Sequence, residues 1–542
     1  MPQGSIFTFN DSILDSQSLV FAIVIASFSR IRADLPGFYY DSEKNRYFPI
    51  KGPIPGSASW RSRKPKHEQE QRDDARSRRK RIKTCELIGA RELCGRVVNS
   101  SKWRCGFQGE YQRIQASQPV IWEYQGLKRV ADSGLEQFHI DVQTQEGQHK
   151  SSVLLMGSIR DPISLCEIGG VGHGFYGGSK FYPECVWPVA AESRADGRKA
   201  PNSVWNPRAS LLMPSNISCI KKTMKHSPDV VDANSAVQHA LISTLGSEGS
   251  GGSVYIIKFD EPLDLSFLSR RRICKVASLN CTIWTADCSP IGFQAASGNL
   301  VCTNAGVTSI NLETGVPSQL CLNKVQYLIL QLIQWDGKCY SCWIRNGAIA
   351  TIDVRQRQRH IASLAKHKIY PVTYAKTSSS NALNSVEQGF EIKGNIVPSC
   401  TACMPSSVSS LVSLQMYDQH FLASSMDGLI KLYDHRMMQK GSVQSYEGHV
   451  NSHTRIQLGV DQAERLIISG GEDGKVRVWS IKTGELLFAE KISKSVPATV
   501  CWSGIGERNR QSQENQIYEE CLYGNNSGAW LGSREELFYM QF

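Results

Sequence analysis

The residues of this chain best suited to binding a partner lie in two short Asp-x-Arg sequences, Asp353-Val-Arg355 and Asp434-His-Arg436. In an extended strand, residues two apart lie on the same side, so each carboxylate can hold the neighbouring guanidinium. An arginine fixed in this way at a strand end can form bidentate contacts with the carboxylate or carbonyl groups of a partner. The pattern predicts a protein-binding surface, with an ordinary local ion pair as the alternative for each copy.

Other patterns that could carry chemistry fail on their surroundings. Gly172-His-Gly-Phe-Tyr-Gly177 has the spacing of a dinucleotide loop, but glycine and prolines follow where a phosphate-binding helix would have to begin. The pairs Cys339-x-x-Cys342 and Cys400-x-x-Cys403 are too far apart for a compact zinc ribbon. We find no nucleophile elbow, no phosphate loop and no His-Glu-x-x-His sequence. The sequence favours a non-catalytic protein with no cofactor and no metal; an enzyme is the alternative, because propellers can also host catalysis.

The Asp-x-Arg sequences end two copies of a repeated unit. Asn346–Arg355, Asp427–Arg436 and Asp473–Lys482 each begin with Asn-Gly or Asp-Gly and end on a cation eight places after the glycine. Asn-Gly and Asp-Gly favour the type I′ turn of a two-residue hairpin. The alternation that follows, as in Ile430 and Leu432, is the period of a half-buried strand. The unit is therefore strand, tight turn, strand.

The copies recur at the spacing of propeller blades. Their glycines sit at 347, 428 and 474, with weaker copies at 306 and 252, so the steps are 54, 41, 81 and 46 residues. A four-stranded blade takes about 40–45 residues, so the step of 81 fits one blade plus an insertion. At that length seven or eight blades need roughly 300–350 residues, which the chain can supply. The sequence predicts an all-β propeller with seven or eight blades.

Composition divides the chain into four segments. Residues 1–33 are an N-terminal extension, and 34–50 carry turn residues and five aromatic residues that predict a hairpin. Residues 51–100 are a basic linker that we expect to be largely disordered. Residues 101–542 hold the propeller, with a polar, low-complexity insertion near 376–405.

The net charge of +11 is concentrated in the linker. Between Arg61 and Lys83, eleven Lys/Arg against four Asp/Glu give +7. The run Arg78-Arg-Lys-Arg81 fits a nuclear import signal, a nucleic-acid patch or a solvated linker. Only Trp60 lies near enough to offer a stacking surface, which disfavours nucleic acid. The sequence predicts a nuclear location, with the cytoplasm as a second compartment.

Cysteine usage and hydropathy disfavour secretion and membrane insertion. The 17 cysteines are odd in number and form no framework, which is typical of reduced thiols in a cytosolic or nuclear protein. No segment reaches the ~20 apolar residues of a spanning helix. The run Leu19–Phe28 resembles the core of a signal peptide, but no Lys or Arg precedes it. We expect no membrane partner.

The last copy of the repeat resembles a WD repeat. Gly448-His449 is followed by a strand, Ser469, Asp473 before a glycine, and then Trp479. In that family a His, a Ser or Thr, the turn Asp and the Trp form a buried hydrogen-bonded set. The resemblance implies a structural role for His449, Ser469, Asp473 and Trp479.

The ends of the two earlier copies are similar to the W-D-x-R box of substrate receptors for cullin-RING ubiquitin ligases. Ile352 and Tyr433 stand in the place of the Trp. The segment 34–48, with Leu-Pro-Gly-Phe-Tyr-Tyr-Asp before Arg-Tyr-Phe, resembles the N-terminus of one receptor family in particular. That family is the fourth DDB-and-cullin-associated factor, a WD-repeat protein.

The resemblance implies a receptor that docks on the large damaged-DNA-binding adaptor of a cullin-four ligase and presents an unknown protein substrate for ubiquitination. Arg355 and Arg436 would contact the adaptor, with Asp353 and Asp434 positioning them. The alternative is a nuclear WD-repeat scaffold that binds chromatin or RNA-processing partners through the basic arm.

Overall fold

The computed structural model describes a discontinuous set of residues in two units, Met1–Arg81 and Ile82–Phe542, which we treat separately. The described residues are 38–41, 46–49, 107–127, 131–144, 147–158, 163–169, 179–188, 201–206, 210–225, 237–247, 251–263, 272–287, 299–303, 306–312, 314–323, 328–329, 334–335, 339–344, 347–353, 366–369, 390–394, 396–503 and 528–542. The predicted extension 1–33 and basic linker 51–100 lie outside them. Within the described parts, no helix has the length and apolar character needed to cross a membrane.

The first unit contains one described hairpin. Strands β1 (Phe38–Asp41) and β2 (Arg46–Pro49) pair antiparallel, with Phe38 opposite Pro49 and Asp41 opposite Arg46. The aromatic residues of both strands favour this extended pairing. The two strands lie inside the segment 34–50 that the sequence predicts as a hairpin.

In the second unit the described strands form seven sheets of four to six strands. The first sheet in chain order contains β4 (Gly134–Thr144), β5 (Gly147–Gly157), β6 (Ile163–Ile168), β7 (Ser179–Phe181), β9 (Val204–Asn206) and β10 (Ser210–Leu211), and the second contains β11 (Ile217–Lys225), β12 (Val237–Thr244), β13 (Ser253–Lys258) and β14 (Ile273–Ser278). The third contains β15 (Ile283–Asp287), β16 (Asn299–Thr303), β17 (Gly306–Ile310), β18 (Pro317–Asn323), β23 (Lys366–Ile369) and β24 (Phe390–Gly394). The fourth contains β19 (Leu328–Ile329), β20 (Gln334–Trp335), β21 (Cys339–Ile344), β22 (Ala348–Asp353) and β25 (Ile396–Cys403).

The next two sheets hold the two best-described copies of the repeat. We call them the Asp434 sheet and the Trp479 sheet, and in each the four strands pair in chain order. The Asp434 sheet is β26 (Val408–Ser413), β27 (His420–Ser425), β28 (Ile430–Asp434) and β29 (Gln444–Tyr446); the Trp479 sheet is β30 (Leu458–Val460), β31 (Leu466–Gly470), β32 (Lys475–Ser480) and β33 (Leu486–Lys491).

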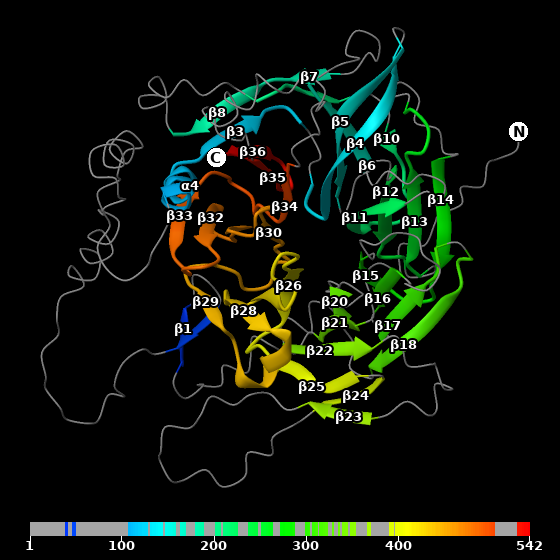
Figure 1. Cartoon of the computed structure of the whole chain (residues 1–542), viewed down its shortest axis with the longest axis vertical. Coiled ribbons are helices and arrows are strands. Elements are labelled where there is room, and N and C mark those ends of the chain that lie inside the picture. Colours follow the sequence, from blue (N-terminus) through cyan, green and yellow to red (C-terminus); the bar gives the residue numbers. More distant parts are fainter. Residues whose placement is uncertain are drawn as a thin grey trace, which may run out of the picture. The chain divides into compact units, whose positions relative to one another are not determined.

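The seventh sheet joins the two ends of this unit. Its C-terminal strands are β34 (Thr499–Trp502), β35 (Gly528–Gly532) and β36 (Leu537–Gln541), and its N-terminal strands are β3 (Val120–Tyr124) and β8 (Pro183–Trp187). Val120 pairs with Gln541, so strands from opposite ends of the chain share one sheet (Figure 1). Closure of this kind removes the free sheet edges that would otherwise pair with other chains.

Between most neighbouring sheets, the innermost strands contact each other. These contacts link β34 to β4, β4 to β11, β11 to β15 and β15 to β19, and on the other side β26 to β30 and β30 to β34. Figure 1 shows the sheets of this unit following one another in chain order. The prediction of an all-β propeller built from WD repeats is confirmed.

The repeat turns differ from the predicted type I′ hairpin. Gly428 and Gly474 have positive φ angles of 82° and 73°, but Asp427 and Asp473 before them do not. The Asp427 carboxylate instead accepts hydrogen bonds from the Leu429 backbone and from Ser425. An Asp that caps its own turn in this way favours a longer loop in which only the glycine is left-handed.

Two other segments differ from the sequence prediction. Strands β24 and β25 occupy residues 390–394 and 396–403, inside the segment near 376–405 that the sequence predicts as a low-complexity insertion. Residues 376–389 lie outside the described set. The structure adds a helix, α4 (Phe107–Ser117), before the first propeller strand. Arg113 ties it to Glu485 beside β33, with Nη2 3.1 Å from Oε2.

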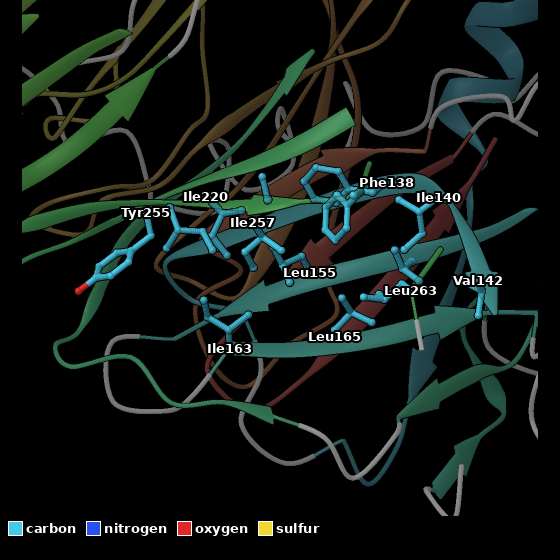
Figure 2. Packing of buried hydrophobic residues seen from close by; sticks show 14 of the residues in the cluster. Phe138, Ile140, Val142, Leu155, Ile163, Leu165, Ile220, Tyr255, Ile257 and Leu263 are labelled. Carbon is cyan, nitrogen blue, oxygen red and sulfur yellow. The ribbon is translucent and has the colours of Figure 1, made fainter. Parts of the chain in front are cut away.

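The cores lie between neighbouring sheets. Figure 2 shows one of them, where Phe138 and Leu155 from the first sheet pack with Ile220 and Ile257 from the second. Each of these side chains is at most 3% exposed. Alternation along each strand directs such residues toward the adjacent sheet, which fixes the strand register. These cores hold the loops and strand ends in place.

Candidate functional site: the strand end at Asp434 and Arg436

The junction between β28 and the 3-10 helix η5 (His435–Lys440) places one Asp-x-Arg sequence at a strand end. Asp434 is the last strand residue and also caps the helix, with φ −104° and ψ 123°. Its Oδ1 accepts a hydrogen bond from the backbone N–H of Arg436 at 2.9 Å. A short carboxylate is favoured here because it satisfies the free N–H groups of a first helical turn. The backbone therefore fixes the carboxylate.

Arg436 binds this carboxylate with two further donors. Its Nε donates to Oδ1 at 3.1 Å and its Nη2 donates to Oδ2 at 2.8 Å. The Asp434 side chain is only 4% exposed, whereas that of Arg436 is 53% exposed. The hydrogen bonds from Arg436 lower the pKa of Asp434 despite its burial. A buried anion thus holds an exposed, planar cation in one orientation.

Aromatic packing supports the strand end from behind. Tyr433, which stands in the Trp place of the box, stacks on Phe421 with ring centroids 5.4 Å apart. The ring of His435 lies 4.6 Å from Phe421, and burial lowers its pKa to about 4. His435 is therefore neutral at pH 7 and adds no charge beside Arg436. The predicted positioning of Arg436 by Asp434 agrees with this geometry.

The second predicted Asp-x-Arg sequence is described only in part. Asp353 is the last residue of β22 and pairs with Cys339 of β21, so it occupies a strand end like Asp434. Arg355 lies outside the described residues. The geometry of the 353–355 copy, and its relation to Arg436, stay predictions.

The four predicted WD residues do not form one hydrogen-bonded set. Ser469 Oγ lies 3.2 Å from His449 Nε2, which also lies 3.0 Å from the Gly470 carbonyl oxygen. The Trp479 ring meets the His449 ring edge to face, with centroids 6.3 Å apart. Its Nε1 donates to the Glu447 carbonyl at 2.8 Å. Three of the four residues therefore pack together, with one side-chain hydrogen bond between them.

The fourth residue, Asp473, binds an arginine that the sequence analysis missed. Arg477 donates from Nη1 to Oδ1 at 3.0 Å and from Nη2 to Oδ2 at 2.5 Å. The Arg477 side chain is 6% exposed. Asp473 precedes β32 and Arg477 lies in that strand. Their spacing of four residues could have predicted an ion pair, but the WD pattern assigns Asp473 to the set of His449 instead.

Metal chemistry has no described site. Within the described ranges, no group of three or more His, Cys, Asp or Glu side chains could hold an ion. The two Cys-x-x-Cys pairs lie on β21 and β25, which flank β22 in one sheet. Cys400 and Cys403 are half-buried.

The comparisons with known proteins match part of the chain. The family described as the DDB1- and CUL4-associated factor 4 beta-propeller domain matches residues 370–503. DDB1- and CUL4-associated factor 4 from Bos taurus and from Homo sapiens are each 39% identical over 82 residues. An uncharacterized WD repeat-containing protein from Caenorhabditis elegans is 30% identical over 90 residues. Each match covers 15% of this chain and 16% of the relative.

The predicted resemblance to this family is confirmed over the matched segment. That segment contains the Asp434–Arg436 pair and all four WD residues, but not Asp353 or Arg355. The matched stretch spans about a sixth of the length of these relatives.

Proposed function

We propose that this protein is a non-catalytic substrate receptor that docks on the DDB1 adaptor of a CUL4 ubiquitin ligase. The observation that carries the proposal is the exposed Arg436, held by the buried Asp434 within the segment that matches the family. The names of the relatives state an association with DDB1 and CUL4. The substrate would be another protein, and the nucleus the expected location.

The geometry suits Arg436 to bind a partner. Asp434 occupies Nε and Nη2, and among the described residues no hydrogen bond uses Nη1. Nη1 carries two N–H donors, so it can bind a carboxylate or carbonyl oxygen of another protein. Because Asp434 already fixes the guanidinium, little side-chain freedom is lost on binding. The pair is prepared for docking without any change in the fold.

Affinity purification of the tagged full chain, followed by mass spectrometry, tests the proposal. We expect the adaptor and the cullin with the wild type, and their loss with Arg436→Glu and with Arg355→Glu/Arg436→Glu. Arg534→Glu is the matched control, because Arg534 is also exposed but lies in the turn between β35 and β36. Normal capture by Arg436→Glu, or no capture by the wild type, would contradict the proposal.

A further inference from the structure

The turn between β26 and β27 exposes two large apolar side chains beside the Asp434–Arg436 pair. Met416 is 69% exposed and Tyr417 is 57% exposed. This turn lies at the same end of the Asp434 sheet as the pair, because His420 at its close pairs with Asp434. The backbone N–H of His435 also donates to the Gln419 carbonyl at 2.9 Å. The turn and the start of η5 are therefore joined.

A glutamate from the neighbouring sheet holds this turn in place. Glu464, between β30 and β31, accepts hydrogen bonds from the backbone N–H groups of Gln415 and, at 3.2 Å, Tyr417. Glu464 is buried and has φ +50°, the one positive φ of a non-glycine residue in the described ranges. This conformation is unfavourable for a side chain of its kind, so the surrounding contacts must over-determine it. Both carboxylate oxygens of Glu464 accept hydrogen bonds from the turn that exposes Met416 and Tyr417.

A row of side chains connects the turn to Arg436. The Tyr417 ring meets the His420 ring edge to face at 6.5 Å, and His420 Nε2 lies 3.9 Å from Asp434 Oδ2. Beyond Arg436, Met437 is 44% exposed. Together Met416, Tyr417, Arg436 and Met437 form what we call the Met416–Met437 surface. Apolar side chains that become buried around a fixed arginine on binding are typical of the centre of a protein interface.

Charge identifies the kind of partner. Arg436 is flanked by Asp434, whose hydrogen bond is the main cause of its raised pKa, and by Asp418, whose charge contributes to the same rise. Two carboxylates around one guanidinium do not provide the positive surface that a phosphate backbone needs. An apolar protein surface with carbonyl or carboxylate acceptors fits instead.

We propose that the Met416–Met437 surface is the apolar part of the DDB1 adaptor contact, with Met416 and Tyr417 as its anchors and Glu464 as a positioning residue. This inference rests on the proposed function. It adds that docking depends on apolar burial beside the arginine and not on Arg436 alone.

The test measures the Kd of the full chain for purified DDB1, with the melting temperature as a check on folding. Met416→Ala/Tyr417→Ala should raise Kd by about tenfold or more, the effect expected for interface anchors. Tyr182→Ala/Leu212→Ala is the matched control, since these two side chains are 69% and 72% exposed elsewhere on the propeller. We expect that control to bind as the wild type does.

The outcomes separate this inference from the proposed function. If the wild type binds, Arg436→Glu does not, and Met416→Ala/Tyr417→Ala binds normally, the apolar contact is overturned and the receptor function stands. If the wild type does not bind DDB1, both are overturned. An equal loss in the Tyr182→Ala/Leu212→Ala control would also overturn the specific role of this surface.

The role of Glu464 needs a different readout. Glu464→Gln replaces one acceptor oxygen of the carboxylate by an N–H₂ group that cannot accept, so the turn should loosen and Kd should rise. If Glu464 acts only by presenting the anchors, the same change should have no further effect in the Met416→Ala/Tyr417→Ala background. An equal rise in Kd in both backgrounds would show a general structural effect and overturn the positioning role.

Discussion

The Asp434 sheet and the Trp479 sheet each contain an Asp–Arg ion pair, but at different depths. In the Trp479 sheet the pair joins the turn residue Asp473 to Arg477 of β32, and the arginine is 6% exposed. In the Asp434 sheet the pair lies at the strand end, and Arg436 is 53% exposed. Similar bidentate geometry therefore serves two purposes. Within the Trp479 sheet the arginine is buried, and at the strand end it stays half exposed, as the proposed docking requires.

The difference follows from where each repeat places its polar and aromatic residues. Trp479 fills the interior of its sheet and donates to a backbone carbonyl, beside the pair formed by His449 and Ser469. Tyr433 at the matching register stacks on Phe421 instead. We infer that the Trp479 sheet is specialised for stability and the Asp434 sheet for binding.

The largest expected effect is on stability, from Trp479→Ala. The Trp479 side chain is fully buried, so its removal leaves a cavity and should cost about 3–5 kcal/mol in free energy of unfolding. Chemical denaturation of the full chain measures this loss. Trp479→Phe is the control, since it keeps a ring but leaves the Glu447 carbonyl without its donor, at about 1 kcal/mol. A smaller loss of stability for Trp479→Ala than for Trp479→Phe would contradict the structural role of the Trp479 sheet.

The second effect is a pH dependence from His449. Burial lowers its pKa from 6.5 to about 4. Between these values the unfolded chain binds more protons than the folded chain, so stability rises with pH from about 4 to 6.5 and is greatest above that window. The full contribution is on the order of 3 kcal/mol. Denaturation midpoints at pH 4.5 and 7 should lie closer together in His449→Gln than in the wild type.

His435, in η5 directly after the Asp434 sheet, offers the same test, because burial also lowers its pKa to about 4. His435→Gln should reduce the pH dependence by a similar share. Parallel pH profiles for the wild type and both variants would contradict the assignment of neutral, buried imidazoles.

Repetition made the propeller predictable from the sequence, whereas its long-range pairings were not. The glycines at 428 and 474 fix the strand–turn–strand unit because each turn requires a positive φ there. The sequence offers no comparable signal for the pairing of Val120 with Gln541, since β3 is five residues long and its partner lies at the other end of the chain. A local sequence pattern predicts that a strand forms, but it does not predict which strand pairs with it.

The candidate site was predictable in identity but not in detail. Asp434 and Arg436 stood out because both lie at a repeated register. The turn that carries Met416 and Tyr417 near this pair could not be foreseen, because Glu464 from the next sheet holds it in place. The interior pair of Asp473 was missed because the WD pattern assigns this Asp to the set of His449, although Arg477 lies four residues on. The sequence offers Asp473 two partners, His449 and Arg477, and the packing of the folded sheet decides which of them it binds.

Arg477→Met should destabilise the fold without affecting docking. The change removes two donors from Asp473, whose carboxylate is 28% exposed, so we expect a loss of about 2 kcal/mol. Denaturation measures the loss, and the Kd for DDB1 under native conditions should match the wild type. Weaker DDB1 binding by a folded Arg477→Met chain would show that the interior pair is not purely structural.

Arg436→Lys should show the reverse pattern, with the smallest effect on stability. Arg436 is 53% exposed, and in Arg436→Lys the Asp434 carboxylate keeps a neighbouring cation and the backbone hydrogen bond from residue 436, so the melting temperature should stay close to that of the wild type. Lysine keeps the charge but loses the planar fork that Asp434 orients, so the Kd for DDB1 should rise by about tenfold. If Arg436→Lys instead lowers the melting temperature as Arg477→Met does and leaves the Kd unchanged, the strand-end pair is also structural. In that case the burial of the arginine would not distinguish an ion pair that stabilises this propeller from one that binds a partner.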